Sequence, residues 1–165
     1  MTQRTVVWLI PTFLTIHNAE EAVAFSRMQQ HLPFALHEPF ATIQSRLTYP
    51  VFVQMLAILS ALAFVLAMIA TLRPQSRAAL WLLLALEAAV AINVIAHVVS
   101  AVVLFHGYGP GLATAVLLNA PFAFYALRRA KREGWVSARA WWALYGAGLV
   151  LHGPVLIGAL WLATR

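Results

Sequence analysis

The side chains with the clearest chemical potential are an imidazole and two carboxylates in the stretch HNAEE, residues 17 to 21. At about 100° per residue, His17, Glu20 and Glu21 fall within roughly 100° on one face of a helix. Imidazole and carboxylate groups suit zinc, iron or manganese. His17 and Glu20 have the spacing of the Glu-x-x-His pairs of carboxylate-bridged di-metal bundles, in reverse order. The stretch predicts a site for a divalent transition metal, zinc or iron, with one or two ions.

The two adjacent carboxylates are expected to differ in role, because their oxygens diverge around a single ion. Glu20 is the expected ligand, by analogy with the Glu-x-x-His pairs, whose two ligands are three residues apart. Glu21 is then the expected catalytic base. In a dinuclear site both would be ligands. A simpler alternative stays open: the helix ends at the two glutamates, whose carboxylates then lie in water, and His17 is a hydrogen-bonded interior histidine.

A second polar stripe is formed by Asn93, His97 and Ser100, at four- and three-residue steps. We expect His97 to be a metal ligand and Asn93 to support it with a hydrogen bond. His152 is a further candidate ligand, with the alternative that it bonds a carbonyl freed by the nearby Pro154. 

Glu87 stands apart from these ligands. It precedes His97 by ten residues, which is about 15 Å along a helix axis. The two side chains can hardly bind one ion, so Glu87 is expected outside the ligand set, as a structural or proton-relay residue.

The composition indicates where these residues lie. The chain has 165 residues, 62% hydrophobic and 10% charged, which is too apolar for a soluble domain of this size. It has no cysteine, which excludes disulfides and thiolate metal sites. Charges interrupt apolar runs of the length that crosses a bilayer, about 20 residues. We predict an all-α, polytopic membrane protein, one domain of residues 1–165, whose five transmembrane helices form a bundle at about 5–24, 50–72, 78–105, 111–128 and 140–163.

The orientation follows from the basic residues. Five spans put eight of the eleven lysines and arginines on the side of the N-terminus and three on the other. Basic loops face the cytoplasm, so the N-terminus is predicted to be cytoplasmic and the loop 25–49 extracytoplasmic. Topology explains these charges without nucleic acid as a partner.

The predicted depths bring the polar residues together. At 1.5 Å per residue, His17 and Asn93 lie near mid-membrane, while Glu20, Glu21 and His97 lie roughly 8–10 Å outward. An ionised group deep in a span costs about 2.5–3.5 kcal/mol, and adjacent carboxylates repel each other. Apart from Arg128 at the very end of the span 111–128, no lysine or arginine lies in a predicted span. A metal ion is therefore the expected partner of these buried histidines and carboxylates.

The motif carries a resemblance. HNAEE, His17 to Glu21, matches the motif that names the HXXEE family, and the chain resembles this family of small bacterial membrane proteins of largely uncharacterised function. The five-span layout and the place of the motif in the first span are similar as well. The resemblance implies the bacterial cytoplasmic (inner) membrane and a metal site, without a defined reaction.

Together these features favour a metal-dependent membrane enzyme that acts on a lipid-like or other apolar small molecule. Zinc would activate water for hydrolysis, and iron would indicate an oxidoreductase. One alternative is a proton- or cation-coupled transporter, and another is a structural or accessory subunit. Polar residues thin out toward the cytoplasmic side, which favours a one-sided pocket. The oligomeric state is left open, as is whether the loop residues His31, His37 and Glu38 join the site.

Overall fold

A computed structural model describes residues 1–28 and 40–165, and this part of the chain is all helical, as predicted. Its elements are α1 (Gln3–Met28), α2 (Phe40–Arg46), α3 (Tyr49–Leu72), α4 (Arg77–Val103), α5 (Leu112–Thr114), α6 (Ala120–Arg132), α7 (Ala138–Val150) and α8 (Leu156–Ala163). Single π-helical turns join α5 to α6, at Ala115–Asn119, and α7 to α8, at Leu151–Val155. The described residues therefore form five long helical segments and the short α2.

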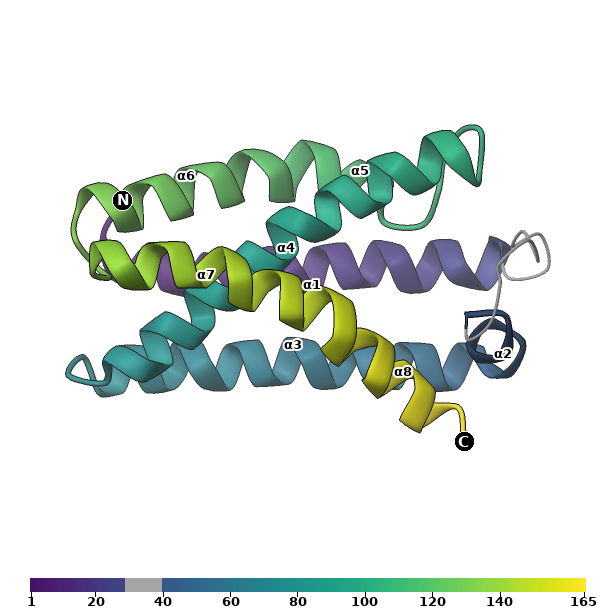
Figure 1. Ribbon diagram of the computed structural model, residues 1–165, viewed down its shortest axis with the longest axis horizontal. Coiled ribbons are helices and arrows are strands. Elements are labelled where there is room, and N and C mark those ends of the chain that lie inside the picture. The colour runs from purple at the N-terminus through teal and green to yellow at the C-terminus, as the bar shows by residue number, and fades with distance from the viewer. Residues whose placement is uncertain (29–39) are drawn as a thin grey trace.

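The long segments alternate in direction along the bundle (Figure 1). The N-terminus, the turn between α3 and α4 and the turn between α6 and α7 lie at one end, and the C-terminus lies at the other. We call the first end the basic end, because the eight basic residues of the N-terminus and these two turns gather there. They are Arg4, Arg73, Arg77, Arg128, Arg129, Lys131, Arg132 and Arg139. α4 and the segment α7–α8 cross the other helices obliquely.

Prolines explain the two π-helical turns. Proline has no N–H to donate and its ring collides with the carbonyl four residues earlier, so the hydrogen-bonding register must widen. Pro154 lies inside the turn Leu151–Val155, and Pro121 follows Ala115–Asn119 by two residues. Both widened turns pack against α4, the helix that carries Asn93 and His97.

Three helices in the described part are long and apolar enough to cross a membrane: Tyr49–Leu72, Arg77–Val103 and Ala138–Ala163. Three of the five predicted spans thus correspond to helices with the length and hydropathy of a membrane span. α1 carries the polar motif, and the segment α5–α6 ends in four basic residues, which lowers the hydropathy of both. Large apolar side chains such as Leu117, Leu72 and Val102 are more than two-thirds exposed, which is typical of an apolar environment around the bundle.

The apolar core occupies the half of the bundle near the basic end. It is built by the first half of α1, the first half of α4, α6 and α7, with members such as Ile10, Leu84, Phe122 and Leu144. α7 approaches α4 very closely at Gly148, where an added Cβ would lie 2.9 Å from backbone atoms of Ala88 and Ala89. Small residues permit such close crossings between membrane helices.

The boundaries differ from the predicted ones around the motif. α1 continues to Met28, so Glu20 and Glu21 lie inside the helix, and the alternative that they mark its end is wrong. Part of the predicted loop 25–49 is helical, at the end of α1 and in α2. His31, His37 and Glu38 lie outside the described residues.

Candidate metal centre

Three predicted residues come together where α1 meets α4. His17, Glu21 and His97 each offer one ligand atom, and these atoms lie within 4.8 Å of one another. Oε1 of Glu21 is 3.2 Å from Nε2 of His97 and 3.9 Å from Nε2 of His17. The two rings meet edge to face, with their centroids 4.9 Å apart. His17 is fully buried, whereas the side chains of His97 and Glu21 keep 13% and 16% of their surface exposed.

Hydrogen bonds fix the orientation of both rings. Nδ2 of Asn93 lies 3.0 Å from Nε2 of His17 and 3.0 Å from Nε2 of His97. An amide nitrogen only donates, so both Nε2 atoms accept and the neutral rings carry their proton on Nδ1. Nδ1 of His17 then donates to the Thr114 hydroxyl, 2.8 Å away. The lone pairs of both Nε2 atoms therefore face Asn93 and Glu21.

With both rings in this neutral tautomer, the group of His17, Glu21 and His97 contains no positive charge. The Nε2 lone pair of His97 faces a carboxylate oxygen of Glu21 at 3.2 Å, and two acceptors at that distance repel each other. A cation between them, either a proton or a metal ion, removes the repulsion. The donor set of two imidazoles and one carboxylate is also a known catalytic zinc set.

The two distances that involve Glu21 suit one metal ion, and all three ligand atoms lie within 4.8 Å of one another. A tetrahedral ion with bonds of about 2.0–2.1 Å separates its ligand atoms by roughly 3.4 Å, and Glu21 lies 3.2 and 3.9 Å from the two Nε2 atoms. The ion would use the lone pairs that now accept from Asn93, so the amide would have to release them. The residues present therefore fit a mononuclear site held by His17, Glu21 and His97.

Gly111 closes one side of the group. A Cβ on this residue would lie 2.7 Å from Cγ of Glu21 and 2.8 Å from Cε1 of both His17 and His97. Its φ of +76° is also in the left-handed region that glycine adopts without strain. Both the close approach and the positive φ require glycine at this position. Because Gly111 has no side chain, the loop before α5 packs directly against Glu21, His17 and His97.

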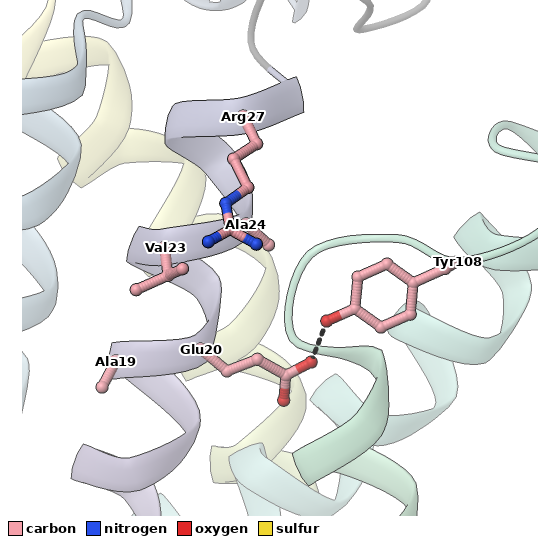
Figure 2. Close-up of a pocket in the computed structure, with 6 residues that line it drawn as sticks. All are labelled: Ala19, Glu20, Val23, Ala24, Arg27 and Tyr108. Atoms are coloured by element: carbon pink, nitrogen blue, oxygen red, sulfur yellow. Dashed lines mark hydrogen bonds between the residues drawn. The ribbon is translucent and has the colours of Figure 1, made fainter.

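Glu20 does not join this group. Its Oε1 accepts from the Ala113 N–H at 3.1 Å, and its Oε2 accepts from the Thr114 N–H at 2.7 Å. The Tyr108 hydroxyl also donates to Oε1 (Figure 2). Desolvation, together with this hydrogen bond, raises the pKa of Tyr108 to about 12, so the phenol stays protonated. Glu20 thus caps the first turn of the segment α5–α6, where free N–H groups favour a carboxylate.

The remaining polar candidates lie beside the candidate metal centre or nearer the basic end. His152 is half-buried in the π-helical turn after α7 and is close enough to His97 and Glu21 for electrostatic interaction, but it is not part of the three-residue group. Glu87 is buried among apolar residues of α4, and its Oε1 has no hydrogen-bond partner among the described residues. Asn119 is buried as well, and its Nδ2 likewise has no partner in the described part.

Sequence reasoning missed Tyr108, Gly111 and Thr114. All three lie on or just after the stretch HGYGPG, residues 106 to 111, which contains none of the predicted site residues. Three glycines and a proline within six residues are a signal for special backbone geometry. Thr114 gave no such signal, because a single threonine in an apolar helix is common.

The chain was compared with known proteins. A search of curated proteins found no match, and a search of solved structures found none either. A family model, described as a protein of unknown function with HXXEE motif, matches residues 8–126. This match runs from the first part of α1 to the middle of α6, and it includes His17, Glu21, Asn93 and His97, so the chain belongs to the HXXEE-motif family.

Proposed function

We propose that this protein binds one divalent transition-metal ion, zinc or iron, through Nε2 of His17, Oε1 of Glu21 and Nε2 of His97. The observation that carries the proposal is the convergence of these three ligand atoms within 4.8 Å. They come from helices far apart in the sequence, and the converging lone pairs lack a cation. Asn93 donates to both rings before the ion binds, and Thr114 fixes the tautomer of His17.

The roles of the two carboxylates change in this proposal. Glu21 takes the ligand role, because its oxygen faces both imidazoles. Glu20 positions the segment α5–α6 through the backbone N–H groups of Ala113 and Thr114. These hydrogen bonds keep Gly111 and Thr114 in contact with the proposed metal ligands. The role of Glu21 as catalytic base stays a prediction.

We further propose that the long segments cross the bacterial cytoplasmic membrane five times with the N-terminus inside. Three of them have the length and hydropathy of membrane spans, and the other two pack with them in one bundle. The eight basic residues of the basic end support its cytoplasmic placement. The candidate centre then lies in the outer half of the membrane.

The reaction best supported is metal-dependent hydrolysis or oxidation of an apolar small molecule. A bound ion would supply a Lewis acid, an activated water or a redox centre. Three protein ligands leave a coordination position open, as in catalytic sites. The partial exposure of Glu21 and His97 leaves the group reachable, and the bundle around it is apolar, which favours an apolar substrate.

Metal content tests the proposal. Protein purified without chelators should carry about one zinc or iron ion per chain by elemental analysis. His17→Ala and His97→Ala should each lower the occupancy to near zero, because loss of one ligand of three weakens binding strongly. Glu21→Gln should lower it as well, while Glu20→Gln should leave most of the metal bound.

The matched control is His106→Ala, which removes an exposed histidine of the neighbouring loop. It should keep the wild-type metal content. Gel filtration of each variant separates loss of the ion from loss of the fold. Wild-type protein that is metal-free and takes up neither Zn²⁺ nor Fe²⁺ in equilibrium dialysis would contradict the proposal.

A proton- or cation-coupled carrier is the second candidate, favoured by one observation. Glu87 is a buried carboxyl nearer the basic end, and it has an oxygen without a partner among the described residues. Such groups mark proton and ion paths in membrane proteins. Flux of protons or Zn²⁺ into proteoliposomes, abolished by Glu87→Gln, would place the carrier ahead of the enzyme.

A further inference from the structure

A surface groove runs along the flank of α1 near the end opposite the basic end (Figure 2). It encloses about 540 Å³ and is lined by Ala19, Glu20, Val23, Ala24, Arg27 and Tyr108. Its floor is apolar, and Val23 is about half exposed. Glu20 lines the groove, and the next residue of α1, Glu21, belongs to the candidate metal centre and does not line it.

The described residues that line the groove include one cation, Arg27, and one carboxylate, Glu20. Both oxygens of Glu20 are engaged by Tyr108, Ala113 and Thr114. No carboxylate of the described residues forms a salt bridge with Arg27. Figure 2 shows the Arg27 side chain turned back along the helix, with its guanidinium near Ala24 and not beyond the end of α1. The charge therefore lies over the apolar floor, which fits an anion bound there.

A second groove on the other side of Tyr108 differs in charge. It encloses about 950 Å³ between α4 and the segment α5–α6, and Tyr108 lines both grooves. Its lining is apolar apart from His106 and Tyr108, and it includes no lysine or arginine. Of these two grooves, the one on α1 therefore pairs an apolar floor with a cation, which suits one chain with one charged head.

The direction of the groove matches that of a membrane amphiphile. Arg27 follows Ala19 by eight residues, or about 12 Å along α1. If α1 crosses the membrane as proposed, Arg27 lies at the water interface and Ala19 lies deeper. A charged head on Arg27 would then direct its alkyl chain inward past Val23, parallel to the lipids.

We propose that this groove binds a single-chain anionic amphiphile of the fatty-acid type. The carboxylate of the ligand pairs with the Arg27 guanidinium, and its chain lies on Val23 and Ala19. Arginine binds carboxylates through parallel N–H donors. The inference rests on the membrane placement proposed above, and it supplies a substrate class for the centre at Glu21.

Binding of a nitroxide-labelled fatty acid to the full-length protein in nanodiscs tests the proposal. Electron paramagnetic resonance separates immobilised from free probe. Arg27→Gln should weaken binding by about tenfold or more, as expected for loss of a charged hydrogen-bonded pair, and Arg27→Lys should keep part of the affinity. Arg46→Gln, at the exposed end of α2, is the matched control and should leave binding unchanged.

The apolar floor is tested separately. Val23→Trp should fill the groove and weaken binding, while Val65→Trp, at a similarly exposed valine of α3, should not. A labelled fatty alcohol, which lacks the charge, should bind to wild-type protein as weakly as the fatty acid binds to Arg27→Gln. A labelled two-chain phospholipid should bind weakly as well.

The outcomes separate this inference from the metal proposal. The same titrations on chelator-treated protein should give the same affinities, because Arg27 is not a metal ligand. Equal binding of the fatty acid to wild-type and Arg27→Gln protein would overturn the inference, whatever the metal content. Equal or tighter binding of the phospholipid would overturn the single-chain ligand.

Discussion

Two buried polar regions of this bundle differ in how their groups are partnered. Around His17, Asn93 and Thr114 form hydrogen bonds with imidazole nitrogens, and Oε1 of Glu21 lies 3.2 Å from Nε2 of His97. Glu87 and Asn119 lie nearer the basic end, and each has a polar atom without a partner in the described part. The first region is a connected network, and the second is two separate groups.

The difference between the two regions reflects the free-energy cost of burying polar groups in an apolar bundle. A buried polar group without a partner costs free energy, and a buried charge costs far more. In the described part of the chain no cationic side chain forms an ion pair with Glu87, so burial among apolar residues favours its neutral acid form. Around Glu21, the helices instead bring several acceptors to one point, where a cation can satisfy all of them. The first region is therefore built to receive a charge and the second to avoid one.

The largest effect is expected from Gly111→Ala, which pushes a methyl group into the network. The added Cβ would lie 2.7–2.8 Å from atoms of Glu21, His17 and His97, and alanine is strained at a left-handed φ. We therefore expect the unfolding free energy to fall by about 2–4 kcal/mol and almost all of the metal to be lost. Gly134→Ala is the matched control: its φ is +64° with nothing within 4 Å. It should cost only about 1–2 kcal/mol and keep the metal. Thermal unfolding and elemental analysis measure both, and equal effects of the two substitutions would contradict the close packing at Gly111.

A smaller effect distinguishes the two asparagines. Asn93→Leu removes the donor to two imidazole nitrogens, so we expect a loss of about 1–3 kcal/mol in unfolding free energy. Asn119→Leu removes an amide whose nitrogen has no partner among the described residues, so its cost should be near zero. Unfolding by denaturant in detergent micelles compares the two variants. A costlier Asn119→Leu would mean that the amide has a partner, such as a buried water, and that the second region is also a network.

The sequence predicted the helices and the residues of the network because both depend on strong local signals. Long apolar runs between basic turns specify helices in a membrane, and polar residues inside such runs are too costly to lie there by chance. His17, Asn93 and His97 were recognised in this way, whereas Glu87 was placed outside the ligand set because it precedes His97 by ten residues. The number of spans is a prediction that the three apolar helices support only in part.

The roles of Glu20 and Glu21 could not be predicted, because they depend on a third element. Helical spacing places both carboxylates near His17, but it contains no information about the loop that packs against α1. That loop leads into a helix beside Glu20, and the first N–H groups of this helix donate to the Glu20 carboxylate. Of the two carboxylates, Glu21 then faces the imidazoles. Long-range pairing of this kind is invisible to periodicity, although the glycines of HGYGPG indicated unusual backbone geometry.

The smallest effect is expected from Glu87→Gln. If the carboxyl is neutral, the amide has nearly the same shape, no charge and the same missing partner, so the unfolding free energy should change by less than about 0.5 kcal/mol. The metal content should stay at the wild-type level, because Glu87 is not among the three residues whose ligand atoms converge. Glu87→Leu should be neutral or stabilising, since it removes a buried group that lacks a partner. Thermal unfolding of the three proteins in one detergent measures these differences. A loss of more than 2 kcal/mol in Glu87→Gln would show that Glu87 is ionised and paired with a cation, and the contrast between the two regions would then fail.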